Sequence, residues 1–558
     1  MNRHDSDVIV IGGGLAGMVC ALQLLDANRR VLLLDRDTPE HLGGLAKESF
    51  GGLLLVDTPL QRRQRLKDSP ELALADWLAF GEFDAASTQR GHPFYWPRQW
   101  AEHYVHDSLE HLYHWLLARG VKFLPLPLWV ERGMGAGSPR GAPRGNSVPR
   151  WHVAWGTGKG LTDALAAQLE RHPRRGRLTL QFGHRVEGLI TTAGAVSGCQ
   201  GVVEAGGEPF EAHAPQVVIA AGGINGGDLS LARRHWHPDW GPEAPEGLLS
   251  GSHRYADGTL HRAAEAVGGQ LTHLRNQWNY AGGIAHWRPR KPRHGLSLVP
   301  PRSALWLNAR GERIVPPLVS GFDTRDLVTQ VCAQPGGYSW QVLNRKIALK
   351  ELAISGAEFN PSVRDKRMLG FVLDIALGNR WLLKEVLAHS TDVVTAASLD
   401  ELAAGMNALQ GTAEVSAQTL REVVRHYDAE VAKGAASQDP QRQRIAQLRQ
   451  WKGDRLRVCA AARIDDPGAR PLIAIREQII SRKSLGGIQT NLSSQVLGAT
   501  GEPIAGLYAV GEAAGFGGGG MNGLRGLEGS FLGGCIYSAQ RAARAMIASI
   551  PTQPLGPP

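Results

Sequence analysis

The chain has 558 residues, of which 43% are apolar and 20% are charged, and its formal net charge is +9 at pH 7. This length exceeds one ordinary hydrophobic core, and the composition excludes an extensively disordered chain. The five cysteines are scattered singly, so the sequence predicts no structural metal, no iron–sulfur centre and no redox disulfide.

The basic residues are dispersed along the chain, and no nucleic-acid-binding motif accompanies them. We therefore interpret the positive charge as a solvated surface, and expect no nucleic-acid partner. No stretch approaches the ~20 apolar residues that a membrane helix needs, so no integral membrane segment is expected. A strand pattern begins by residue 7 and leaves no room for a secretory leader, which predicts a cytoplasmic protein.

The N-terminus carries the pattern of a dinucleotide-binding unit. Residues 7–11 are an apolar run typical of a buried parallel strand, followed by Gly12-x-Gly14-x-x-Gly17 and a stretch with helical spacing. Gly12 permits the tight turn, Gly14 lets the backbone approach a pyrophosphate, and Gly17 lets the helix pack on the strand. A second strand ends in Asp35, where a carboxylate can bind a ribose hydroxyl.

More glycines follow in Leu42-Gly43-Gly44-Leu45-Ala46 and Phe50-Gly51-Gly52. A nicotinamide domain has no need of them, whereas a flavin ring can lie flat against a backbone without Cβ atoms. Because residue 45 is Leu, it cannot make the covalent flavin link that a His would allow. The glycines therefore favour FAD as the cofactor, and Leu45 favours noncovalent binding.

The middle of the chain changes character at about residue 274. Residues 216–223 are a buried strand that ends in glycines, whereas 274–465 are first rich in Trp, Pro and basic residues and then Ala/Leu-rich and helical. We interpret 274–465 as an inserted substrate-binding domain. The flavin pattern resumes at about 466, and the proline-rich tail 551–558 is expected to be disordered.

The C-terminal part supplies the second half of the expected cofactor site. A strand pattern over 503–510 ends in Gly511 and Glu512, and the glycine-dense stretch 517–534 leads into a helix. Backbone N–H groups and the positive end of a helix stabilise negative charge on a reduced flavin. The sequence thus predicts an α/β fold, in which a Rossmann-type, glutathione-reductase-like FAD-binding domain is formed by 1–273 and 466–550, with 274–465 inserted as an α+β cap.

These segments resemble the fumarate reductase / 3-ketosteroid dehydrogenase superfamily of FAD-dependent oxidoreductases, and most closely its ketosteroid-dehydrogenase-like bacterial branch. The matching segments include Trp96-Pro97-Arg98-Gln99-Trp100, Val148-Pro149-Arg150-Trp151-His152, Gly321-Phe322-Asp323-Thr324 and the stretch 517–534. The resemblance covers nearly the whole chain. It implies that Glu512 binds the ribityl chain. With the fingerprint it places the following residues at FAD: Gly12, Gly14, Leu15, Ala16, Gly17, Asp35, Arg36, Gly43, Gly44, Ala46, Ser49, Gly51, Gly52, Val186, Ala220, Gly222, Gly511, Glu512, Gly526, Ser530 and Phe531.

Members of this superfamily pass a hydride between a substrate carbon and flavin N5 while a protein group handles the neighbouring proton. The resemblance places Arg525 where fumarate reductases grip a substrate carboxylate, and Lys483 where they carry a His. Ketosteroid dehydrogenases have a Tyr before a Gly-Pro turn, whereas this chain has Phe516 followed by four glycines. We therefore expect a different proton carrier and prefer Tyr280; Tyr338, His253 and Tyr255 are the other candidates.

Three functions remain open at this point. The first is a dehydrogenase that acts on a CH–CH unit beside a carbonyl in a hydrophobic substrate. The second is a fumarate-reductase-like ene-reductase of an unsaturated carboxylate, favoured by Arg525 and Lys483. The third is a non-catalytic flavin-binding redox subunit. The reductase would need an external electron donor, because the sequence has no haem or iron–sulfur motif. The partners considered are an external electron acceptor or donor and a second copy of the chain in a homo-oligomer.

Overall fold

The computed structural model describes residues 6–133 and 145–549. Its first sheet has six strands, drawn from both ends of the chain. The order is β20 (Gln495–Leu497), β21 (Pro503–Ala509), β9 (Val217–Ile219), β1 (Val8–Ile11), β2 (Val31–Leu34) and β5 (Leu178–Gln181). All neighbours are parallel except β20 and β21. The four residues of β1 and the four of β2 are all buried, as expected of strands covered on both faces.

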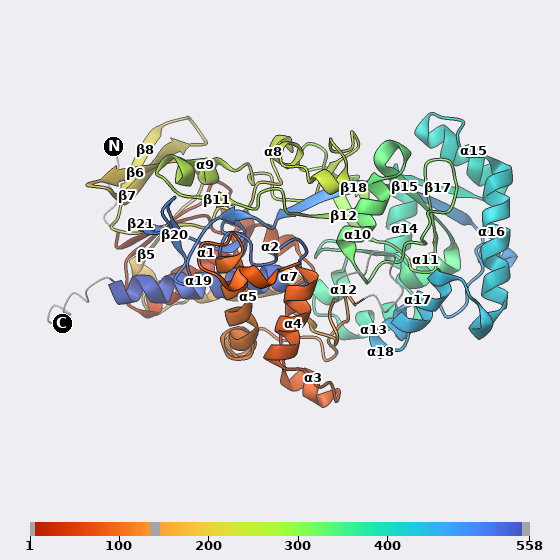
Figure 1. The fold of residues 1–558 in the computed structure, drawn as a ribbon, viewed down its shortest axis with the longest axis horizontal. Helices are drawn as coiled ribbons and strands as arrows, with labels where there is room; N and C mark the ends of the chain where they lie inside the picture. The colour runs from red at the N-terminus through yellow and green to blue at the C-terminus, as the bar shows by residue number, and fades with distance from the viewer. Residues whose placement is uncertain (1–5, 134–144, 550–558) are drawn as a thin grey trace.

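Helices from both chain ends pack together beside this sheet. Helix α1 (Leu15–Asp26) follows β1 directly and packs on α19 (Ser530–Ser549), the last helix that the structure describes. Helix α7 (Thr157–Glu170) lies beside α1 and α2 (Gly44–Glu48). In Figure 1 the red and blue segments share the left half of the molecule, where α1 and α19 are labelled.

A second sheet of eight strands forms the other half of the molecule. Its main path is β14 (Leu305–Leu307), β15 (Tyr338–Asn344), β18 (Leu472–Ser484), β12 (Gln277–Ala285), β13 (Gly295–Val299) and β16 (Ala353–Ile354), and β10 (Leu249–Ser250) and β17 (Val393–Ala396) also pair with β18. The green and cyan helices at the right of Figure 1 surround it. They include α10 (Thr324–Cys332), α11 (Arg345–Glu351), α12 (Pro361–Arg364), α13 (Met368–Leu377), α14 (Arg380–His389), α15 (Leu399–Gln410), α16 (Ala417–Ala432), α17 (Pro440–Leu448) and α18 (Lys452–Arg457).

The long strand β18 joins the two halves. It begins at Leu472 and pairs with β15 and β17 along its first part, and its last residues pair with β12 next to the pocket described below. The predicted boundary at residue 465, between the inserted domain and the C-terminal part of the FAD-binding domain, stays a prediction. Strand β18 begins after this boundary but pairs with strands that lie before it. The predicted tail 551–558 lies outside the described residues.

Several further elements complete the part that positions the site. A three-stranded sheet contains β6 (His184–Thr192), β7 (Ala195–Val203) and β8 (Pro209–His213). Helices α4 (Pro70–Phe80) and α5 (Tyr95–Asp107) pack on each other, and α19 also contacts β3 (Gly52–Leu54). Within the described ranges, no helix is both long and apolar enough to span a membrane.

Candidate functional site

One large pocket lies where the strands of the six-stranded sheet end. Including its open mouth it encloses about 1510 Å³. Ile11 at the end of β1, Leu34 at the end of β2 and Val510 just after β21 all line it. In open α/β sheets ligands bind outside the carboxyl ends of the parallel strands, so the position of the pocket follows from the topology of the sheet.

The fingerprint glycines form one wall of this pocket. Gly12 has φ of +111°, and a Cβ there would lie 2.4 Å from the carbonyl oxygen of Ala220. A Cβ on Gly17 would lie 1.9 Å from the Gly12 oxygen, so glycine at this position allows helix and strand to approach, as predicted. By contrast, a Cβ on Gly14 would meet no atom within 4 Å and would project into open space.

Asp35 lies where the dinucleotide pattern expects a carboxylate. Its Oδ2 accepts a hydrogen bond from the Gly13 backbone N–H at 2.5 Å, and burial raises the pKa of the carboxyl group. The neighbouring Arg36 also lines the pocket, but its guanidinium forms ion pairs with Glu204 and with Asp257. This end of the pocket therefore combines a carboxylate with an arginine that is already neutralised.

The second group of glycines lies along the pocket as the sequence indicated. Gly43, Gly44, Gly51 and Gly52 line it, and Leu45 lies among them. At Gly51, with φ of +86°, a Cβ would come within 2.5 Å of the backbone that begins α7. The segment between α2 and β3 thus approaches the start of α7 closely at this wall.

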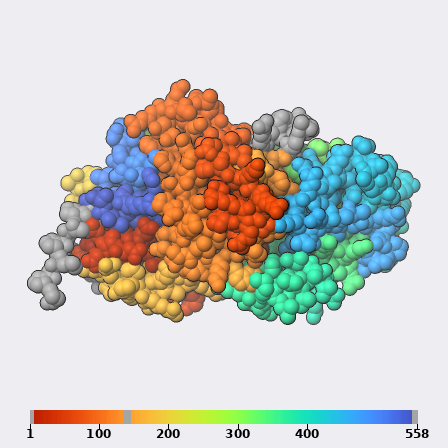
Figure 2. Space-filling model, turned by 90° about the horizontal axis from the view of Figure 1, so that it is seen from below, coloured from red at the N-terminus to blue at the C-terminus, as the bar shows by residue number. Residues whose placement is uncertain are grey.

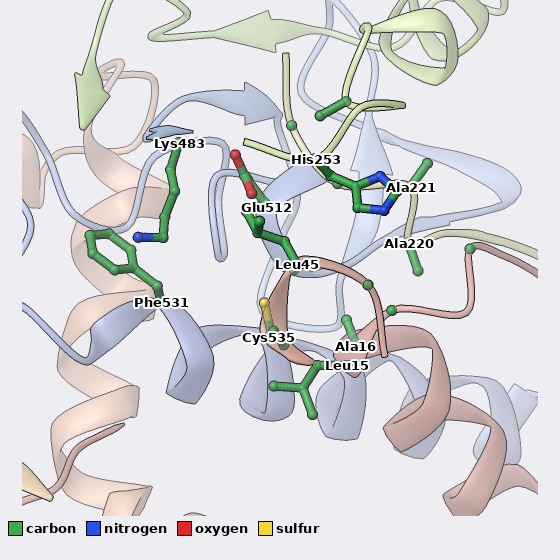
Figure 3. Close-up of a pocket in the computed structure, with 18 of the residues that line it drawn as sticks. Leu15, Ala16, Leu45, Ala220, Ala221, His253, Lys483, Glu512, Phe531 and Cys535 are labelled. Carbon is green, nitrogen blue, oxygen red and sulfur yellow. The ribbon is translucent and has the colours of Figure 1, made fainter. Parts of the chain in front are cut away.

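Glu512 approaches the pocket from the end of β21. Its Oε1 accepts a hydrogen bond from the Ser484 backbone N–H at 3.0 Å, and burial raises the pKa of its carboxyl group to about 7. In Figure 3 Glu512 lies between Lys483 and Phe531 on one side and Ala220, Ala221 and His253 on the other. It therefore marks the middle of an elongated site.

A second polar group forms the end of the pocket next to β12 and β18. The Tyr280 hydroxyl donates to Glu528, 3.1 Å from each carboxylate oxygen, and the Trp278 indole N–H donates to the same carboxylate at 3.1 Å. Burial raises the pKa of Tyr280 well above its usual value, and the nearby Glu528 carboxylate contributes a smaller increase. The phenol is therefore held as a donor to Glu528.

Lys483 lies in the same part of the pocket. Its Nζ lies 4.1 Å from the centre of the Phe531 ring, toward which it points in Figure 3. Burial lowers the pKa of the amine to about 8, although Glu528 acts in the opposite direction. An amine with this pKa can donate hydrogen bonds as an ammonium group or accept a proton within the physiological range.

The structure does not bring Arg525 into the pocket lining. Its Nε donates to Asp323 at 2.9 Å, and its Nη1 pairs with Glu82. Only 11% of the Arg525 side chain is exposed, and both carboxylates are supplied by the protein. The guanidinium is thus committed to an internal ion-pair cluster.

The other candidate proton carriers lie elsewhere. His253 and Tyr255 line the pocket, but His253 is 3.4 Å from Asp37, and the Tyr255 ring stacks with Arg36 at the Asp35 end. Tyr338 is buried in the core of the eight-stranded sheet and does not line the pocket. Among the four candidates, only Tyr280 lies beside Lys483 and Glu528.

The structure brings most of the predicted cofactor residues together. The pocket is lined by Gly12, Gly14, Leu15, Ala16, Asp35, Arg36, Gly43, Gly44, Ala46, Ser49, Gly51, Gly52, Val186, Ala220, Gly222, Gly511, Glu512 and Phe531. Gly17, Gly526 and Ser530 lie behind it. Ser530 donates to Asn522 at 2.7 Å, and a Cβ on Gly526 would press on the Phe531 ring at 2.7 Å.

The residues present fit a long flavin dinucleotide. The pocket runs from the Asp35 carboxylate to the Lys483 amine. A Cβ on Gly14 or Gly222 would meet no protein atom within 4 Å, so both glycines border open space. The Gly14 backbone lies at the start of α1, where free N–H groups favour phosphate. The cradle and its donor set are thus suited to FAD.

Glu528 is the functional candidate that the sequence reasoning missed. The stretch 517–534 contains one predicted catalytic residue, Arg525, and three predicted FAD contacts, but no role is predicted for Glu528, its single acidic residue. A carboxylate in a glycine-dense segment, three residues after Arg525, was the available signal. Arg482 also lines the pocket and donates to the Gly251 carbonyl at 2.8 Å.

Comparison with known proteins identifies the family of the chain. Residues 7–532 match the family model described as FAD binding domain. The chain is 42% identical to a KsdD-like steroid dehydrogenase of Mycobacterium tuberculosis, over 97% of this chain and 95% of that protein. Its fold resembles a 3-ketosteroid Δ1-dehydrogenase from Sterolibacterium denitrificans, with a TM-score of 0.66, 16% identity and coverage of 99% and 100% of the two chains.

The fold also resembles a flavocytochrome c3 fumarate reductase, with a TM-score of 0.65, 19% identity and coverage of 97% of this chain and 78% of that one. The mixed helix and sheet fold of these flavoproteins is therefore confirmed. So are the predicted FAD cofactor and the predicted class of a ketosteroid-dehydrogenase-like, FAD-dependent oxidoreductase. The chain belongs to the FAD binding domain family, and the part matched extends from its first strand to the start of its last described helix.

Proposed function

We propose that the protein is a dehydrogenase of an apolar ketone of the 3-ketosteroid type, with noncovalent FAD held along the glycine-lined pocket. When bound, FAD accepts a hydride from a substrate carbon at its N5 position. The observation that carries the proposal is the grouping of Lys483, Tyr280 and Glu528 at one end of this pocket. The ketosteroid dehydrogenases among the relatives support the class of substrate.

The proposal assigns the two halves of the molecule different tasks. The six-stranded sheet serves as a Rossmann-type, glutathione-reductase-like FAD domain built from 1–273 and 466–550, because strands and helices from both ends contribute to it. Residues 274–465 serve as the cap over the flavin. Support comes from Tyr280 on β12, which reaches the pocket from this segment.

We assign to Glu528 the task of accepting the substrate proton. Its carboxylate lines the pocket and is oriented by donors from Tyr280 and Trp278, which leaves lone pairs for a substrate C–H proton. Tyr280 acts here as a positioning residue, because its proton is directed at Glu528 and its pKa is raised well above the usual value. This role differs from the proton carrier that the sequence favoured.

We assign to Lys483 the task of stabilising the charge that develops on a ketone oxygen. As the α-proton leaves, negative charge accumulates on the carbonyl oxygen, and a preorganised ammonium donor lowers the energy of that state. The amine lies in a pocket wall away from bulk water, where such an interaction is stronger than in solution. It therefore takes the task for which a ketosteroid dehydrogenase uses its C-terminal Tyr.

The carboxylate-reducing alternative is less well supported. It relied on Arg525 and Lys483 as a joint clamp, but the Arg525 guanidinium is bound to Asp323 and Glu82 outside the pocket. Glu528 would also face a substrate carboxylate with like charge. A neutral ketone meets neither difficulty.

Anaerobic spectroscopy of the oxidised flavin band tests the proposal. We expect saturated 3-ketosteroids to bleach the band in the oxidised enzyme, with electrons passing afterwards to an external acceptor. Unsaturated carboxylates should leave the prereduced enzyme unchanged. Reoxidation by a carboxylate, with no bleaching by any cyclic ketone, would replace the dehydrogenase proposal by the reductase.

A further inference from the structure

Helix α13 (Met368–Leu377) presents an apolar side to solvent. Leu369 is 74% exposed, Val372 is 51% exposed and Leu373 is 46% exposed, a spacing that places all three on one face of the helix. Met368 and Leu377 are also more than half exposed, at 54% and 58%. Most surface helices of globular proteins show the opposite pattern, with the apolar face inward.

The inward side of the same helix is anchored. The Phe371 ring packs edge-on against Trp155, with ring centres 5.8 Å apart. The Asp374 carboxylate accepts a hydrogen bond from the Ser362 hydroxyl at 2.6 Å. Because an aromatic contact and a polar contact hold this side, the outward direction of the leucines is fixed.

A basic pocket adjoins the C-terminal end of α13. It encloses about 740 Å³ with its open mouth, and Arg345, Lys346 and Lys350 of α11 form its polar wall. Its apolar wall includes Leu349 and the last residues of α13, Ile375, Ala376 and Leu377. All three cations are exposed, and none has a carboxylate within ion-pair distance in the part of the chain that the structure describes.

Two further cations extend the positive charge beyond this pocket. Arg380 and Lys384 of α14 follow α13 in sequence and are exposed, and Trp381 between them is 43% exposed. Figure 2 shows the teal-green segment that contains α13 and α14 at the surface beside the orange N-terminal part. An exposed apolar helix bordered by exposed cations and a tryptophan is the pattern of a helix that lies in a membrane interface.

We propose that α13 docks this protein on an anionic phospholipid surface, with the three cations of α11 binding a lipid phosphate. The apolar face of α13 enters the boundary between headgroups and acyl chains, parallel to the membrane, and α13 is too short to cross it. A symmetric pairing with a second copy explains the pattern less well, because an isologous contact over α13 brings two basic pockets together without counter-charge.

Vesicle sedimentation of the flavin-loaded protein tests this inference. We expect binding to vesicles of phosphatidylcholine with phosphatidylglycerol, and little binding to phosphatidylcholine alone. The variant Leu369→Ser with Leu373→Ser should lower the partition coefficient at least about tenfold. Lys346→Ala with Lys350→Ala should lower binding to the anionic vesicles about fivefold for each cation removed, an effect that high salt abolishes.

Matched controls separate docking from misfolding and from general charge. Leu117→Ser removes another exposed leucine, and Arg171→Ala with Arg177→Ala removes two exposed arginines elsewhere on the surface. These controls should bind vesicles like the unmodified protein, and all variants should keep its FAD content and Tm. Equal binding by the α13 double variant would overturn the proposal. So would no binding to any vesicle, or a dimer in light scattering that Leu369→Ser with Leu373→Ser converts to monomer.

Discussion

Replacing Lys483 by Met should slow turnover while making the fold more stable. The Met side chain has nearly the same shape as the Lys side chain but lacks the ammonium group, which donates the proposed hydrogen bond to the ketone oxygen. Loss of one preorganised donor of this kind lowers kcat by about 10²–10³-fold. Burial lowers the pKa of Lys483 from 10.5 to about 8. This difference corresponds to a reduction of about 3 kcal/mol in the free energy of unfolding when the buried amine is protonated.

The pH dependence of the stability gain has a definite sign. Below pH 8 the amine is protonated in both the folded and the unfolded chain, so the flavin-free Lys483→Met variant gains up to about 3 kcal/mol. Between pH 8 and 10.5 the folded amine is neutral while the unfolded one still carries its proton, and the gain shrinks. Above pH 10.5 it disappears. Opposite changes in kcat and Tm identify a residue retained for function at the expense of stability.

The assay follows anaerobic bleaching of the flavin by a 3-ketosteroid, together with Tm, from pH 6 to 10. In the unmodified enzyme we expect the rate of bleaching to fall as pH rises through about 8, because the ammonium donor is lost. Lys483→Met should lack this fall, and Lys159→Met, at an exposed lysine paired with Asp163, serves as the control. A Lys483→Met enzyme with normal kcat, or one that still loses activity near pH 8, would refute the assignment.

Three other variants test the rest of the site. Glu528→Gln keeps the shape of the side chain but cannot take a proton, so we expect flavin reduction to slow about 10²–10⁴-fold with FAD fully loaded; normal stopped-flow kinetics would reject Glu528 as the base. Gly14→Leu places a side chain in the open space of the cradle and should give a folded but colourless protein, whereas a yellow, fully loaded variant would contradict the dinucleotide assignment. Arg525→Ala leaves Asp323, which is 4% exposed, without its partner, so we expect a destabilisation of about 3 kcal/mol, measured as a lower Tm, and near-normal kcat per bound flavin. A large loss of kcat at unchanged Tm would instead indicate that Arg525 takes part in catalysis.

The residues around Lys483 illustrate why part of the site escaped prediction. Arg525 and Glu528 lie three positions apart in one glycine-dense stretch, and nothing in their spacing reveals which one faces the pocket. Glycines leave the backbone free to adopt many paths, so the direction of each side chain is set by partners far away in sequence. Asp323 and Glu82 hold Arg525 away from the pocket, while Trp278 and Tyr280 hold Glu528 toward it.

Local patterns alone determined the N-terminal dinucleotide-binding unit of this protein. The turn at Gly12, the close approach at Gly17 and the carboxylate at Asp35 are backbone and short-range requirements, which the sequence carries within thirty residues. Only the tertiary structure decided which charged groups meet at the far end of the pocket and which side of α13 faces water. Those outcomes depend on the packing of β12, β18 and α11, which are distant in sequence, and the preference of a residue for helix or strand contains no information about that packing.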